Sequence, residues 1–72
     1  MSLKKHSIEL FGHKTSISLE EEFWIALREI ATEKNTSVLS LIKEIDSKRT
    51  TPLSSSVRVF VLNYLLTKIH KK

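Results

Sequence analysis

The stretch that decides the fold is Lys14-Thr15-Ser16-Ile17-Ser18-Leu19, which runs directly into Glu20-Glu21-Glu22-Phe23-Trp24. Side chains alternate along a β-strand, so the first part predicts a strand with Lys14, Ser16 and Ser18 outward and Thr15, Ile17 and Leu19 inward. The three glutamates predict a helix start, because carboxylates suit the positive end of the helix dipole. A lone strand leaves backbone donors and acceptors unpaired, so the source of its partner strand decides most of the functional interpretation.

The composition indicates one small folded domain. The chain has 72 residues, is 40% hydrophobic and contains no cysteine. A domain of this size hides only about 60% of its unfolded surface, so we expect oligomerisation to supply extra core. The lack of cysteine excludes disulfide staples and thiolate metal sites. The net charge of +4 is modest for nucleic-acid binding and fits many ordinary basic proteins.

The hydrophobic residues are not arranged for a membrane. No apolar run approaches the roughly 20 residues needed to span a bilayer. The N-terminal residues Met1–His6 lack the apolar core of a signal peptide. We therefore expect a cytoplasmic protein without a membrane partner.

A first helix is predicted at residues 20–34, where apolar side chains recur at three- and four-residue spacing. Ser18 and Glu21 have the spacing of a capping box at its start. Asn35 suits the left-handed conformation that often ends a helix.

A second helix is predicted at residues 38–48, with Thr36 and Ser37 as cap candidates, and the Thr50-Thr51-Pro52 segment ends it. The last segment, residues 54–69, contains Val57–Val61, which could form a strand by alternation. We favour a third helix, because the apolar segment is longer than a usual strand. Since this helix is apolar around much of its circumference, we expect it to be largely buried, against a partner.

The predicted strand can find its partner in two ways. Within one chain, Ser7–Phe11 could fold back onto Lys14–Ser18 through a two-residue Gly12-His13 turn, with Ile8 opposite Ile17 and Leu10 opposite Thr15. Between two chains, two copies of Lys14–Leu19 could pair antiparallel across a two-fold axis. A two-stranded ribbon fits the major groove of DNA, whereas an extra strand along each edge of the two-chain ribbon would make it too wide.

The order of elements resembles the ribbon-helix-helix DNA-binding proteins, which include Arc- and MetJ-like repressors. The resemblance covers about residues 13–48. It is similar above all to a bacterial subgroup with an appended segment like Leu53–Leu62, and then extends over nearly the whole chain. The matching residues are Thr15-Ser16-Ile17-Ser18-Leu19, then Phe23-Trp24, Leu27 and Ile30-Ala31, then Asn35-Thr36-Ser37-Val38 and Leu41-Ile42.

The resemblance implies a mainly α fold with one short β-strand, built as an intertwined homodimer with an intermolecular antiparallel ribbon and a third, C-terminal helix. It divides the chain into an N-terminal arm (1–12), a ribbon-helix-helix core (13–49) and a C-terminal helix with a basic tail (50–72). The implied function is a sequence-reading transcriptional regulator, a repressor that binds double-stranded DNA and is nucleoid-associated when bound.

The same resemblance implies roles for individual residues. The base-reading positions are Lys14, Ser16 and Ser18, and the turn before the second helix anchors the DNA backbone. Serines replace the arginine, asparagine or glutamine common in such ribbons, so we expect sequence to be read weakly or through DNA shape. The expected backbone contacts are Thr36, Ser37 and Val38, with Lys4, Lys5 and His13 as an arm; the expected dimer core is Ile17, Leu19, Trp24, Leu27, Leu41 and Ile42.

The sequence gives no sign of an enzyme, and no cofactor is expected. His6, His13 and His70 are scattered without cysteine or carboxylate at ligand spacing, so no metal site is expected. With one glycine in the chain, no glycine-rich phosphate loop is possible. The alternative function is a protein-interaction or antitoxin-like module whose C-terminal helix binds a partner protein.

Overall fold

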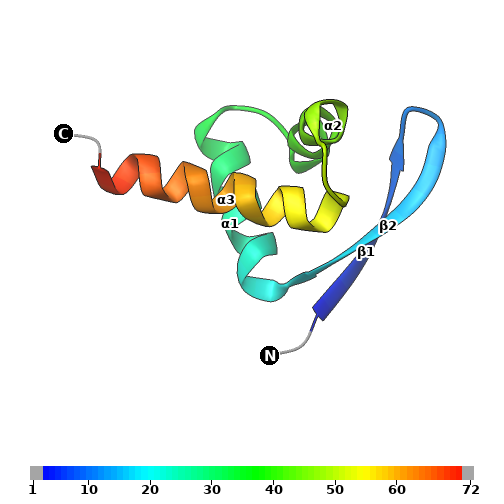
Figure 1. Ribbon diagram of the computed structural model, residues 1–72, viewed down its shortest axis with the longest axis horizontal. Coiled ribbons are helices and arrows are strands. Elements are labelled where there is room, and N and C mark those ends of the chain that lie inside the picture. Colours follow the sequence, from blue (N-terminus) through cyan, green and yellow to red (C-terminus); the bar gives the residue numbers. More distant parts are fainter. Residues whose placement is uncertain (1–2, 71–72) are drawn as a thin grey trace.

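The computed structural model describes residues 3–70, which form a β-hairpin followed by three helices (Figure 1). The helices gather around one core, and the hairpin extends along one side of them. The elements in chain order are β1 (Leu3–Leu10), β2 (His13–Glu20), α1 (Glu21–Glu33), α2 (Val38–Lys48) and α3 (Leu53–His70).

The prediction of a single strand is wrong, because Leu3–Leu10 pairs antiparallel with His13–Glu20 in the same chain. The two residues between the strands, Phe11 and Gly12, have φ values of 52° and 84°. Positive φ at both central positions is the property of the type I′ turn, whose twist matches that of a hairpin. Residues that were expected to form an N-terminal arm therefore supply the partner strand.

The hairpin has another turn and register than the intramolecular alternative predicted from the sequence. Ile8 lies opposite Thr15 instead of Ile17, and the turn is Phe11-Gly12 instead of Gly12-His13. A shift of two positions leaves every side chain on its expected face, since faces alternate with period two. In the observed register the pairing runs from Leu3 opposite Glu20 to Leu10 opposite His13.

Trp24, on α1, contacts β1 in the observed register of the hairpin. Its indole Nε1 donates a hydrogen bond of 2.9 Å to the carbonyl oxygen of Lys4. The ring of His6 lies on the same indole, with 4.1 Å between the ring centroids. Both contacts need β1 to run alongside β2 up to the first turn of α1, as the observed register allows.

The three predicted helices are confirmed to within one residue at each end. Ser37 caps α2, since its Oγ accepts a hydrogen bond of 3.0 Å from the backbone N–H of Ser40, and Asn35 has the expected positive φ, 59°. The capping box of Ser18 and Glu21 is wrong. The residue before α1 is Glu20, and it makes no side-chain cap hydrogen bond.

One hydrophobic core closes within the single chain. The six residues expected in a dimer core are all buried in it, at 3% exposure or less. The expected burial of α3 against a partner stays a prediction, because within this one chain Val57 and Val61 are its buried residues and much of the rest reaches solvent. The core consists of Leu10, Ile17, Leu19, Trp24, Leu27, Ile30, Ala31, Leu41, Ile42, Val57 and Val61.

Leu27→Ala should lower the free energy of unfolding by about 3 kcal/mol, because it opens a cavity at a fully buried site. Ile25→Ala is the matched control on the same helix, since Ile25 is 43% exposed, and it should cost less than about 1 kcal/mol. Urea unfolding followed by circular dichroism measures both. Equal losses for the two variants would contradict this core.

Candidate nucleic-acid interface

The hairpin presents a polar face on the side away from the core. Directly opposed residues of an antiparallel pair share a face. The pairs Lys5–Ser18, Ser7–Ser16 and Glu9–Lys14 alternate with the pairs that contain the buried residues Leu10, Ile17 and Leu19. We call these residues the outer face of the hairpin: Lys5, Ser7, Glu9, Lys14, Ser16 and Ser18.

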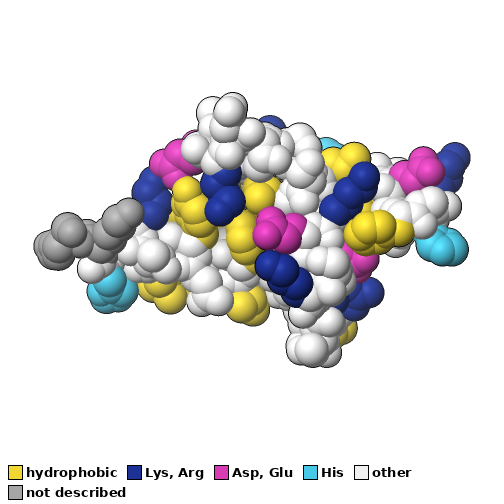
Figure 2. Space-filling view, turned by 90° about the horizontal axis from the view of Figure 1, so that it is seen from above, with side chains coloured by type: hydrophobic (Ala, Val, Ile, Leu, Met, Phe, Trp, Pro, Cys, Tyr) yellow, Lys and Arg dark blue, Asp and Glu magenta, His cyan; other side chains and the backbone are white. Residues whose placement is uncertain are grey.

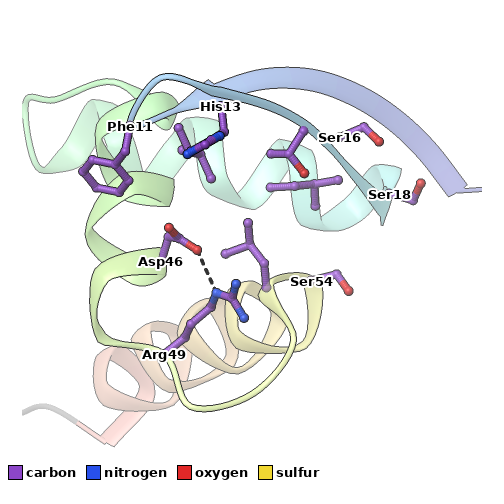
Figure 3. Close-up of a pocket in the computed structure, with 11 residues that line it drawn as sticks. Phe11, His13, Ser16, Ser18, Asp46, Arg49 and Ser54 are labelled. Atoms are coloured by element: carbon purple, nitrogen blue, oxygen red, sulfur yellow. Dashed lines mark hydrogen bonds and ion pairs between the residues drawn. The ribbon is translucent and has the colours of Figure 1, made fainter.

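The outer face is open to solvent. Ser18 is half-buried, and the other five side chains are exposed. Figure 3 shows Ser16 and Ser18 directed away from the groove beneath the hairpin. A macromolecule can therefore reach this face without any change in the fold.

The structure groups some of the predicted contact residues and separates others. Lys14, Ser16 and Ser18 share the outer face, and Lys5 joins them from β1. Lys4 belongs to the opposite face, where its carbonyl accepts the Trp24 hydrogen bond. His13 follows the turn at the tip of the hairpin, while Thr36, Ser37 and Val38 lie where α2 begins.

Ser7 was not predicted as a member of this face. A signal was present, because Lys5, Ser7 and Glu9 alternate with His6, Ile8 and Leu10. That alternation has meaning only once β1 is recognised as a strand. The basic residues at the start of the chain had instead suggested an arm.

The charge on the outer face is mixed. Lys5 and Lys14 provide two cations, and Glu9 lies directly opposite Lys14. Figure 2 shows basic, acidic and histidine side chains together at the hairpin end of the molecule. The face therefore combines hydroxyl groups with two cations, and it is not a strongly basic patch.

A groove of about 440 Å³ lies beneath the hairpin, between it and the α2–α3 connection (Figure 3). Its one arginine is already engaged: Arg49 Nε lies 2.7 Å from Asp46 Oδ1, and Arg49 Nη1 donates to the carbonyl oxygen of Thr51 at 2.9 Å. Within residues 3–70, no group of three histidine or carboxylate side chains could hold a metal ion. The Asp46–Arg49 ion pair in this groove therefore supports the connection between α2 and α3.

Two acids tie α3 to the rest of the fold. At the end of β2, Glu20 Oε1 lies 3.0 Å from Arg58 Nε, and this hydrogen bond holds the pKa of the Glu20 carboxyl below its usual value. At the end of α1, Glu33 accepts hydrogen bonds from Lys68 and Tyr64, which lower its pKa in the same way. Both cations of these pairs belong to α3.

Comparison with known proteins gives one family and one similar structure. The family model described as "Ribbon-helix-helix domain" matches residues 3–65. The solved structure of an uncharacterized protein from Bordetella pertussis Tohama I superposes with a TM-score of 0.81 at 30% sequence identity. The match covers 94% of this chain and 59% of that one, so this chain spans less than two thirds of the Bordetella protein. No curated protein matches the sequence.

No helix among the described residues is long and apolar enough to cross a bilayer.

The Glu20–Arg58 pair predicts a pH dependence. A lowered pKa in the folded state means that the pair stabilises the fold above the unfolded-state pKa, near 4.5, and that this contribution is lost as the pH falls through the folded-state pKa. Glu20→Gln should therefore make the free energy of unfolding fall less steeply between about pH 6 and about pH 3.

The control for this measurement is Glu22→Gln, in the first turn of α1, since Glu22 has no ion-pair partner within the described residues. It should flatten the pH profile less than Glu20→Gln does, because it removes only a first-turn carboxylate from the helix dipole. A profile for Glu20→Gln as steep as that of the wild type would show that the pair makes no contribution.

Proposed function

Because the chain belongs to the ribbon-helix-helix domain family, we propose that it is a DNA-binding protein whose hairpin enters the major groove with its outer face toward the bases. The observation that carries this proposal is the outer face itself. From Lys5 to Ser18 it is a two-stranded antiparallel ribbon of serine, lysine and one glutamate. We place the protein among small transcriptional regulators that act as repressors.

The width of the ribbon supports the proposal. Two paired strands lie about 4.8 Å apart, and the major groove is about 12 Å wide. From the sequence, we expected a ribbon made by two chains, with an intramolecular hairpin as the arrangement that would make such a ribbon too wide. In the present proposal the hairpin is the ribbon, and it stays narrow enough as long as the other edge of β2 remains unpaired.

The side chains of the outer face suit a protein that recognises DNA sequence with modest specificity. The hydroxyl groups of Ser7, Ser16 and Ser18 can donate or accept, so each can pair with more than one base. Lys5 and Lys14 have the reach to contact guanine or a phosphate. Sequence preference would then depend partly on how easily the groove deforms.

Phosphate contacts are proposed on either side of the ribbon. Lys4 and His13 lie on the hairpin away from its outer face and could meet the groove walls. The first turn of α2, after Thr36 and Ser37, offers backbone N–H groups of the kind that bind phosphate at helix starts. The Ser37 hydroxyl already caps Ser40, so Ser37 and Val38 would contribute through their backbone. Such contacts supply most of the affinity of a DNA-binding protein.

Lys5→Ala and Lys14→Ala should each weaken binding to duplex DNA severalfold and make the salt dependence shallower by about one unit of slope, as expected for the loss of one phosphate contact. Fluorescence anisotropy of a labelled duplex over a range of salt concentrations measures both quantities. Lys43→Ala, an exposed lysine on α2, is the matched control and should behave as the wild type.

Two results would remove the hairpin from DNA recognition. One is wild-type affinity and salt slope in both hairpin variants. The other is a flat salt profile in the wild type, since displaced counterions must contribute to binding along the phosphate backbone.

A further inference from the structure

A second groove, of about 500 Å³, lies between α2 and α3. Figure 1 shows α2 beside the first turns of α3, joined to them by the short connection, which also lines the groove. Pockets that hold small molecules measure roughly 300–1,000 Å³. We call this hollow the α2–α3 groove. It shares no residue with the outer face of the hairpin.

The α2–α3 groove has an apolar base. Ile45 on α2 and Phe60 on α3 are half-buried and pack against the hydrophobic core. Val59 adds an apolar side chain that is 53% exposed. The Phe60 ring is also held by Tyr64, with 6.4 Å between the ring centroids. The base therefore offers a positioned aromatic ring and two aliphatic side chains to a ligand.

Cations outnumber carboxylates around this base. Lys34, Lys48 and Arg49 line the groove, and Glu44 is the one carboxylate among the lining residues. Asp46 also counts against this charge, because it pairs with Arg49 from outside the groove. With Asp46 included, the cations still exceed the carboxylates by one, so the groove attracts an anion.

The three cations are available to such an anion. Lys34 makes no ion pair within residues 3–70, and its Nζ lies 5.9 Å from the centroid of the Tyr64 ring. Lys48 pairs with Glu44 at 3.5 Å, but both side chains are exposed, so a ligand can compete for Lys48 at little cost. Arg49 uses Nε and Nη1 for its contacts with Asp46 and Thr51, which leaves Nη2 for a ligand.

We propose that the α2–α3 groove is a binding site for a small aromatic carboxylate, whose ring lies on Phe60 and whose carboxylate faces Lys48 and Arg49. The apolar base supplies the part of the site that a ring can cover, and stacked rings attract each other beyond the area that they bury. The charge excess supplies the preference for an anion. A carboxylate suits both an ammonium and a guanidinium group, since its two oxygens can accept from each of them.

The site combines the two features that small-molecule sites have in common. Such sites bury an apolar body and fix its orientation with a few polar groups. A free phosphate would use the cations and leave Phe60 and Val59 uncovered. An uncharged ring would cover Phe60 and leave the cations without a partner. Only a ligand with both parts uses the whole groove.

Titration of the full chain with 2-naphthoate, without DNA and at constant ionic strength, tests the proposal. Amide chemical shifts in ¹⁵N–¹H spectra should saturate with a dissociation constant between about 10 µM and about 1 mM, as expected for a ligand of this size. The largest shifts should belong to Lys48, Val59, Phe60 and Asn63. The uncharged 2-naphthamide should bind at least about tenfold more weakly, and inorganic phosphate should not saturate in the same range.

Two variants of the groove have matched controls. Val59→Glu should weaken 2-naphthoate binding at least about tenfold, because it adds a carboxylate beside the ligand. Its control is Leu62→Glu, since Leu62 is similarly exposed on α3 and does not line the groove. Lys48→Gln should weaken binding about threefold to tenfold, whereas Lys43→Gln, at an exposed position of α2 outside the groove, should bind as the wild type.

Circular dichroism should show the wild-type fold in all four variants, because each of these residues is exposed. The proposal would be overturned by the absence of saturable 2-naphthoate binding, and equally by shifts centred on Ser7 and Ser16 of the outer face. Equal affinity for 2-naphthamide would exclude the role of the cations. Equal affinity for inorganic phosphate would exclude the role of Phe60, and equal losses in Val59→Glu and Leu62→Glu would place the site elsewhere.

Discussion

The rest of the structure depends on the left-handed turn at Phe11 and Gly12, because this turn pairs β2 with a strand of its own chain. A bulky residue with positive φ costs on the order of 1–2 kcal/mol relative to the right-handed region, so the turn is not chosen for its local preference. It is offset by the cross-strand pairs from Leu3 to Glu20 and by the contacts of Trp24 with Lys4 and His6. Gly12 has free space around its Cβ position, and its φ of 84° explains why glycine is needed there.

Because the hairpin closes within the chain, β2 does not take its partner strand from a second chain. A strand such as Lys14–Leu19 needs a paired edge and a covered apolar face. Here β1 pairs the edge, and the three helices, α3 included, cover the face, so Ile17 and Leu19 are buried without a partner. The hairpin pairing and the hydrophobic core of the described residues are therefore both formed within one chain. The large apolar side chains that remain exposed are concentrated on α3.

The helices could be predicted from the sequence because their signals are local. The spacing of apolar residues predicted all three helices. Asn35 lies after the end of α1 and Ser37 at the start of α2, as predicted. The first strand could not be predicted with the same certainty, since Leu3–Leu10 mixes basic and apolar residues and gains its meaning from pairing. The turn was misplaced because Phe11 has a positive φ, against the usual preference of type I′ turns, and the observed register is the one in which Trp24 contacts Lys4 and His6. For the same reason the outer face was predicted on β2, while Ser7 on β1 was missed.

The ion pairs of α3 help to determine which of its two apolar sides docks on the core. Exposed ion pairs contribute little to stability, so Glu20–Arg58 and Glu33–Lys68 are not what drives α3 onto the core. Burial of Val57 and Val61 does that, yet a helix that is apolar on both sides could also dock with Val59, Leu62 and Leu66 inward. In that rotation Arg58 and Lys68 would leave their carboxylates. The two ion pairs therefore favour the orientation in which Val57 and Val61 face the core and Val59, Leu62 and Leu66 face outward.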